Sequence, residues 1–377
     1  QATLWSPRPL RWAGRAVGLL GFAVVVVAGF VGPTTPLASA TILLVWVGWW
    51  ASLAILAYLV GNAWPALDPA RTLASALPTG ALDYPERLGA WPGALALLAL
   101  VWLEVVSPIS EEPRVLALAV LGYVALTLVG AVAFGADDWF DNVDPVSRVF
   151  RFYGLVAPLQ RVDGRLRLTL PGSALVDADL DAGDVAFVVA LLWGTPYDGF
   201  VATPAWATVA EAVVGAGVPA HVLYPVALLV GYLLFVGVYL ASVRGARATA
   251  PTFYTTRALA ARFGAALLPI AAGYHLAHYL TYSLSLSPAL VGALTNPLSP
   301  PTPQVLVLPA WLSVVSPVAV LAGHVLAVWV AHAVAYDTFP GRLQAVRSQY
   351  ALTLSMVFYT ITSLWVVSQP TATPPYL

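Results

Sequence analysis

The sequence contains no cysteine among its 377 residues. This absence excludes disulfide bonds, thiolate-ligated metal sites and covalent attachment of a c-type haem. Lysine is absent as well, so all seventeen basic side chains are arginines. Because the formal net charge is only −1, the chain lacks the basic surface that nucleic acid binding requires, and we expect no nucleic-acid partner.

Charged residues are also scarce. They make up 9% of the chain, whereas about 25% is usual in a soluble domain. Hydrophobic residues make up 60%, and several apolar runs exceed the roughly 18 residues that mark a membrane-spanning helix. The composition therefore predicts an all-α, polytopic helical membrane protein in contact with membrane lipid. The exclusive use of arginine suggests a high-GC prokaryote, and hence a multi-pass protein of a prokaryotic plasma membrane.

Hydropathy along the chain predicts nine spans. The fifth is the weakest, because "WGTPYDGF" interrupts its apolar run near Asp198. An alternative with eight full spans and one re-entrant segment stays open. The nine expected spans are 13–34, 39–61, 88–107, 114–135, 184–203, 221–243, 263–287, 311–336 and 349–369.

Arginine placement predicts the orientation of these spans. Sixteen of the seventeen arginines fall in the N-terminal arm and in alternate connections, and Arg114 alone falls on the other side. Positively charged residues are enriched in cytoplasmic connections. We therefore expect the start of the chain, at Gln1, in the cytoplasm and its C-terminal end outside.

The chain is expected to form a single integral membrane domain, 1–377, with a cytoplasmic interfacial insertion at 136–183. Asp144 followed by Pro145 predicts a helix start, with the aspartate as N-cap. Arginines and aromatic residues in the helix that follows are typical of a helix in the membrane interface. The alternation in "RVDGRLRLTLPGS" predicts a short hairpin.

Two cytoplasmic connections resemble one another. "NAWPALDPARTL" follows the second span and "DDWFDNVDPVSRV" follows the fourth, each with a tryptophan and then Asp-Pro and an arginine. The similarity is consistent with a duplicated helical-hairpin unit. The alternative is that Asp-Pro is a common way of starting a helix.

Histidines lie inside two expected spans, where ionisable side chains are costly and mark candidate sites. His275 and His278 share a helix face because they are three residues apart. His324 falls near mid-membrane in the next span, which is antiparallel to theirs. Gly323 would allow another helix or a ligand to approach closely.

The topology also brings carboxylates to the same outer half of the membrane. Imidazoles and carboxylates are the ligands of zinc, copper and non-haem iron. We expect zinc or copper, with an open position at which the metal activates water. The proposed metal ligands are His275, His278 and His324, and the proposed catalytic residues are Glu104, Asp198 and Tyr279, with His221 nearby.

Two other interpretations of the histidines stay open. A single histidine in a membrane is more often a hydrogen-bonded packing residue than a ligand, and this applies most to His221 and His332. Alternatively, His278 and His324 could be the axial ligands of a b-type haem. A porphyrin edge would then fit the gap left by Gly323.

Several stretches together resemble a known family. They are "YPERLGAWP", "VWLEVV", "WGTPYDGF", "GYHLAHYLTYSL" and "AGHVLAVWVAHAVAYD", together with the two Asp-Pro segments, between about residues 60 and 337. In this order they resemble the fenitrothion hydrolase-like multi-pass membrane proteins of bacteria and archaea. The resemblance implies hydrolysis of an organophosphate ester at the membrane, and it assigns no catalytic residue. Asp337 stands five residues after His332, where relatives often carry the acid directly after the histidine.

The sequence therefore supports three alternative hypotheses of function. The first is a metal-dependent membrane hydrolase with an outward-facing histidine and carboxylate site. The second is a haem- or metal-binding subunit that joins other integral membrane subunits in a larger respiratory or redox complex. The third is a transporter.

Overall fold

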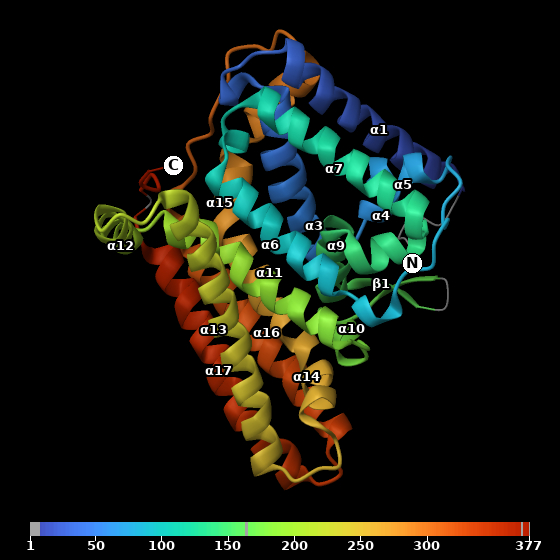
Figure 1. Ribbon diagram of the computed structural model, residues 1–377, viewed down its shortest axis with the longest axis vertical. Helices are drawn as coiled ribbons and strands as arrows, with labels where there is room; N and C mark the ends of the chain where they lie inside the picture. Colours follow the sequence, from blue (N-terminus) through green and yellow to red (C-terminus); the bar gives the residue numbers. More distant parts are fainter. Residues whose placement is uncertain (1–7, 163–164, 371, 377) are drawn as a thin grey trace. The chain divides into compact units, whose positions relative to one another are not determined.

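The computed structural model describes residues 8–162, 165–370 and 372–376. It is 77% helical and contains one small two-stranded sheet (Figure 1). The all-α class and the multi-pass membrane character predicted from composition are thus supported. The chain divides into two compact units: unit 1 is 1–87, 107–169 and 279–312, and unit 2 is 88–106, 170–278 and 313–377.

Unit 1 is built around α1 (Arg8–Val31) and α7 (Pro113–Phe134), which pack against each other. A long π-helical segment, η2 (Leu43–Leu53), continues into α3 (Ala54–Leu59). The shorter elements of unit 1 are η1 (Pro36–Ala38), α2 (Ala40–Ile42), α4 (Trp64–Leu67), α5 (Pro69–Ala74), η4 (Pro108–Ser110), α8 (Ala136–Asp138), η5 (Trp139–Val143), α9 (Pro145–Val156), β1 (Leu159–Val162) and β2 (Arg165–Leu168).

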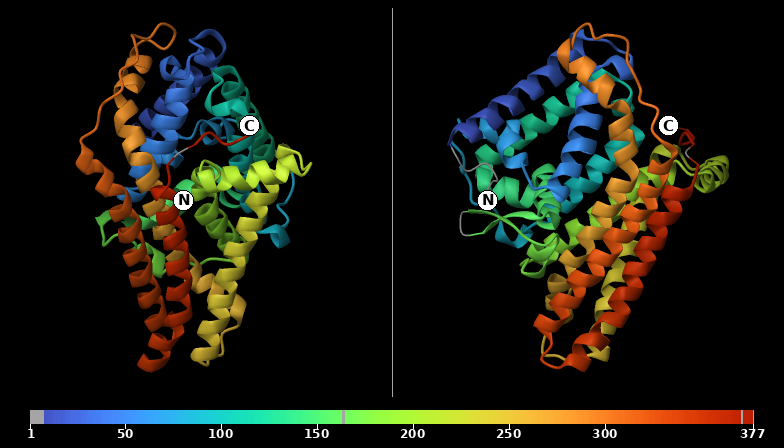
Figure 2. Two further views of the ribbon diagram at one scale, coloured as in Figure 1. Left: turned by 90° about the vertical axis from the view of Figure 1, so that its left-hand side faces the viewer. Right: turned by 180° about the vertical axis from the view of Figure 1, so that it is seen from behind.

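Unit 2 is a helical bundle in which α13 (Ala220–Thr249) and α16 (Val315–Thr338) both pack against α17 (Arg342–Ser368) (Figure 2). The helix α15 (Leu268–Thr295) belongs to unit 2 up to His278 and to unit 1 from Tyr279. The other elements wholly in unit 2 are α6 (Trp91–Val106), α10 (Ser173–Val176), α11 (Ala182–Val201), α12 (Pro204–Gly215), α14 (Thr256–Gly264) and η6 (Ala265–Leu267). Two short elements, η3 (Glu86–Leu88) and η7 (Ala310–Val314), lie where the units change.

Among the described residues, seven helical segments are long and apolar enough to cross a membrane. The expected spans 88–107 and 184–203 are the two outside this set. The first corresponds to α6, which has only 16 residues. The second corresponds to α11 and α12, which pass the test only as a pair and are bent by 79°. The total of nine spans therefore stays a prediction.

Within 136–183, the structure contains the elements that the sequence predicts. Asp144 caps α9 with Pro145 at the first helical position, and β1 pairs antiparallel with β2. The helix α9 is largely enclosed by protein, because ten of its twelve residues, including Arg148 and Phe150, are buried. Its expected place in the membrane interface stays a prediction. Residues 136–169 belong to unit 1 and 170–183 to unit 2.

The two Asp-Pro segments meet inside unit 1. Asp68 caps α5 by accepting hydrogen bonds from the backbone N–H groups of Ala70 and Arg71. Asp144 caps α9 and accepts a hydrogen bond from the Tyr123 hydroxyl. Ser147 joins the two, since its N–H donates to Asp144 at 3.0 Å and its hydroxyl to Asp68 at 3.4 Å. Both carboxyl groups are buried, with side chains about 1% exposed.

Burial, together with the charge of Asp144, raises the pKa of Asp68 from its ordinary value of 3.8 to about 7. Burial likewise raises the pKa of Asp144. Between about pH 4 and pH 7 the folded protein therefore holds a proton that the unfolded chain has released. The resulting stabilisation is complete below about pH 4 and is lost as pH rises toward 7.

We therefore expect the free energy of unfolding to fall as pH rises through this window, by at most roughly 4 kcal/mol for a shift of three pKa units. Asp68→Asn should flatten this dependence, because asparagine keeps the N-cap but carries no titrating proton. The measurement is the thermal unfolding midpoint in detergent at pH 5 and pH 8. The matched control is Asp179→Asn, because Asp179 is exposed. If the unfolding midpoints of wild type and Asp68→Asn depend on pH in the same way, the prediction is wrong.

Candidate functional site

The candidate site begins at the bend between α11 and α12. Asp181 and Asp184 form a capping box at the start of α11, and the helix continues past Pro196 to Val201. A new helix then starts because Thr203 caps it, accepting a hydrogen bond from the Trp206 N–H at 3.2 Å, and Pro204 occupies the first position. Asp198 thus lies in the last turn of α11, immediately before the 79° bend.

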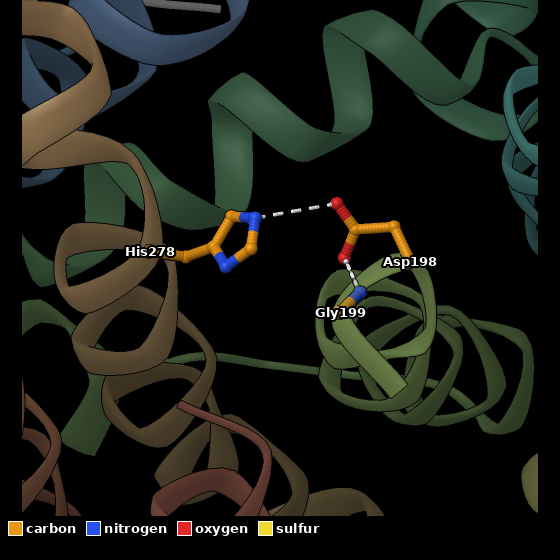
Figure 3. A network of polar contacts seen from close by, with 3 residues as sticks. All are labelled: Asp198, Gly199 and His278. Atoms are coloured by element: carbon orange, nitrogen blue, oxygen red, sulfur yellow. Dashed lines mark hydrogen bonds and ion pairs between the residues drawn. The ribbon is translucent and has the colours of Figure 1, made fainter. Parts of the chain in front are cut away.

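Asp198 faces His278 of α15. The His278 Nε2 atom lies 3.5 Å from Asp198 Oδ2, and the second carboxylate oxygen accepts the Gly199 N–H at 2.6 Å (Figure 3). The Asp198 side chain is 24% exposed and the His278 side chain 29% exposed, so neither is fully enclosed. The pair is therefore held in place and partly exposed.

Gly199 allows α11 to come this close to its neighbours. A methyl group at this position would lie 2.6 Å from the Tyr274 hydroxyl oxygen and 2.9 Å from a methyl carbon of Val366. The Tyr274 ring stacks on the His278 ring, with centroids 5.8 Å apart. The Tyr274 hydroxyl is buried and has no hydrogen-bond partner among the described residues. It is therefore a buried donor that the described residues leave unsatisfied, close to Gly199.

Glu104 adds a second carboxyl group to the same cluster. It lies near the end of α6, which packs along α11, and it is close enough to Asp198 for the two charges to interact. The two carboxylates carry like charges, which repel each other. We call Glu104, Asp198, Tyr274 and His278 the acid–base cluster. Its members come from α6, α11 and α15.

The other histidines have surroundings of their own, and their predicted role as metal ligands stays a prediction. His324 makes a 2.8 Å hydrogen bond to Thr360, and His332 makes one of 2.9 Å to Gln349. His221 is exposed at the start of α13, and His275 is fully buried in α15. Within the described part of the chain, no three histidine, aspartate or glutamate side chains are arranged to hold a metal ion. The zinc, copper and haem predictions stay untested.

The predicted close approach at Gly323 is confirmed, but its partner is a helix. A methyl group on Gly323 would lie 2.3 Å from the Pro269 carbonyl oxygen, and the Cα atom of Gly273 would be 3.1 Å away. The backbones of α15 and α16 therefore cross here. The gap in which a porphyrin edge was expected is filled by α15, so the haem interpretation loses its steric argument.

Tyr279, the tyrosine predicted to assist catalysis, belongs to unit 1. It packs edge-on against Trp50 with ring centroids 6.1 Å apart. Tyr274 is the tyrosine in the acid–base cluster. Its position four residues before His278 was the available signal, because residues at i and i+4 share a helix face.

Comparisons with protein families, with curated proteins and with solved structures find no significant match for this chain.

Proposed function

We propose that this chain is a multi-pass protein of a prokaryotic plasma membrane that hydrolyses a small ester at the acid–base cluster. The observation that carries the proposal is the pairing of His278 with Asp198 at 3.5 Å, with Glu104 beside them. Ionisable side chains are rare in apolar helices because they are costly there, and those that occur usually have a function. The ester substrate follows from the resemblance of the sequence to fenitrothion hydrolase-like proteins.

The proposed topology has nine spans, with the start of the chain in the cytoplasm and the end outside. Seven apolar helices, the bent pair α11–α12 and the shorter α6 together would supply nine. The strongly uneven distribution of the arginines supports the orientation. In this topology the acid–base cluster is open to the outer side.

In the proposed reaction, His278 takes a proton from water, and Asp198 stabilises the imidazolium that forms. The hydroxide oxygen bonds to the phosphorus or acyl carbon of the ester, and the bond to the leaving oxygen breaks. Glu104, protonated in the proposed starting state, gives its proton to the leaving oxygen. The imidazolium proton then returns to that carboxylate, which restores the starting state. Tyr274 donates a hydrogen bond to the substrate oxygen.

Metal-assisted hydrolysis is tested in the same experiment. The 3.5 Å separation of His278 Nε2 and Asp198 Oδ2 is also near the roughly 3.4 Å between two ligands of tetrahedral zinc. Zinc or copper would there supply a more acidic bound water.

A second candidate function is proton-coupled transport, which the bend beside Asp198 favours. Discontinuous helices that carry an ionisable residue at the break are a recurring feature of transporter sites. In α11–α12 the break follows Asp198 by only a few residues. The acid–base cluster would then bind a proton together with the transported solute.

One experiment separates these functions. Purified protein in detergent is assayed for release of nitrophenol from phosphotriester and carboxylic esters, with and without a chelator, and its metal content and optical spectrum are recorded. The same preparation in proteoliposomes is assayed for proton uptake driven by added solute. Hydrolysis that Asp198→Asn abolishes and the chelator spares supports the metal-free proposal. Loss on chelation selects the metal-assisted reaction, a haem absorption band selects the redox subunit, and proton uptake without hydrolysis selects transport.

A further inference from the structure

The β1–β2 hairpin carries an exposed apolar face that the proposed function does not use. All four residues of β2 are exposed, and Leu168 is 82% exposed. Leu170, just beyond the strand, is 69% exposed. The described part of the hairpin projects from the rest of unit 1 (Figure 2). Large apolar side chains at such exposure are unfavourable in water, so this face needs a covering surface.

The strand register separates the hairpin into two faces. Directly opposed residues of antiparallel strands share a face, and neighbours along a strand alternate. Leu159 opposes Leu168, and Arg161 opposes Leu166, so these four lie on one face. On the other face, Gln160 opposes Arg167 and Val162 opposes Arg165. One face therefore carries three leucines and Arg161, and the other carries Arg165 and Arg167 with Gln160 and Val162. The long side chain of Arg161 can lie along the leucines while its guanidinium group reaches the phosphate layer.

Charge decides between the surfaces that could cover the leucines. Residues 159–170 contain three arginines and one acidic residue, Asp163. Arg165 and Arg167 are both exposed. Leucines that enter the acyl boundary while arginines reach the phosphate layer are the arrangement by which amphipathic elements bind anionic membranes. A second protein surface would need acidic groups matched to these arginines.

We infer that the β1–β2 hairpin docks on the surface of the surrounding bilayer, with Leu166 and Leu168 in the acyl boundary and Arg165 and Arg167 on anionic lipid headgroups. The hairpin is a peripheral lipid-binding element of an integral membrane protein. This function goes beyond the proposed hydrolysis and does not depend on it.

The absence of cysteine gives a clean background for the test. Leu168→Cys and, as the matched control on the opposite face, Val162→Cys are each labelled with an environment-sensitive fluorophore. Full-length protein is reconstituted in bilayers of phosphatidylcholine alone or mixed with phosphatidylglycerol, with the acyl chains of one lipid brominated. The expected result is quenching at position 168 and not at 162, stronger when the brominated lipid is phosphatidylglycerol. Each arginine near an anionic surface should strengthen binding of the hairpin by about fivefold. The stronger quenching by brominated phosphatidylglycerol should therefore decline when Arg165 and Arg167 are both changed to glutamine.

Two outcomes would overturn the inference. In the first, the fluorophore at 168 is as exposed to water as that at 162 in every bilayer. In the second, the fluorophore at 168 is unquenched in bilayers but shielded from water in detergent, and the shielding increases with protein concentration. That result would mean that a second copy of the chain covers the leucines. Quenching that is equal with both lipids and unchanged by the two glutamines would also contradict the assignment of the arginines.

Discussion

Replacing His278 with glutamine is expected to lower the turnover rate of the hydrolytic reaction by about 100-fold to 10,000-fold, the usual contribution of a general base. Glutamine keeps a polar side chain of similar length but cannot take a proton from water. His278 is the imidazole that faces Asp198, at 3.5 Å, and the ring that stacks on Tyr274. The loss should therefore appear in the rate of the chemical step, with a smaller effect on substrate affinity. The measurement is the initial rate over a range of ester concentrations.

His221→Gln and His332→Gln are the matched controls. The first residue is exposed at the start of α13, and the second hydrogen-bonds to Gln349. Neither belongs to the acid–base cluster, and each variant should keep its rate within about twofold, as expected for groups that take no part in proton transfer. Equal losses in all three variants, or full activity in His278→Gln, would show that the chemistry lies elsewhere.

Gly323→Ala is expected to destabilise unit 2 by about 3 kcal/mol, because the added methyl group has no room. It would lie 2.3 Å from the Pro269 carbonyl oxygen, which belongs to backbone and cannot rotate away. The helices α15 and α16 would have to separate, although Ser316 ties them by donating to the Ala277 carbonyl at 2.8 Å. The thermal unfolding midpoint and the fraction of folded monomer in detergent are the two measurements.

Gly237→Ala provides the comparison. Gly237 lies inside the long apolar helix α13 of the same unit, and a methyl group there would meet no atom within 4 Å. Alanine should be neutral or stabilising at this position, since glycine costs up to about 1 kcal/mol in a helix interior. If Gly323→Ala unfolds at the same temperature as Gly237→Ala, the close crossing of α15 and α16 is wrong.

Local signals in the sequence predicted several elements well. The Asp144–Pro145 pair predicted the start of α9, the alternation after it predicted the hairpin, and the break in "WGTPYDGF" predicted the bend after Asp198. Each of these depends on a few adjacent residues with strong backbone preferences. Gly323 predicted a close helix approach for the same reason, since only glycine lacks the atom that would clash.

Which residues form the acid–base cluster depends on tertiary packing, and the sequence predicted this less well. His275 and His278 lie three residues apart, yet His278 is the one that faces Asp198, while His275 is fully buried. Which of them meets α11 depends on how α15 is rotated against its neighbours, and periodicity does not define this rotation. The same applies to α9. Its arginines favoured a helix in the membrane interface, and they did not show that Arg148 is buried and donates to the Asp141 carbonyl.

The most direct test of the acid–base cluster is nitrogen NMR of the protein labelled at its five histidines, recorded between about pH 5 and pH 9. His278→Gln identifies the resonance of His278, and Asp198→Asn tests its pairing. We expect the His278 imidazole to gain and lose a proton within this range, and we expect that titration to change when Asp198 becomes asparagine. A His278 resonance that stays constant over the whole range, or that titrates identically in Asp198→Asn, would contradict the proposal that this pair exchanges protons.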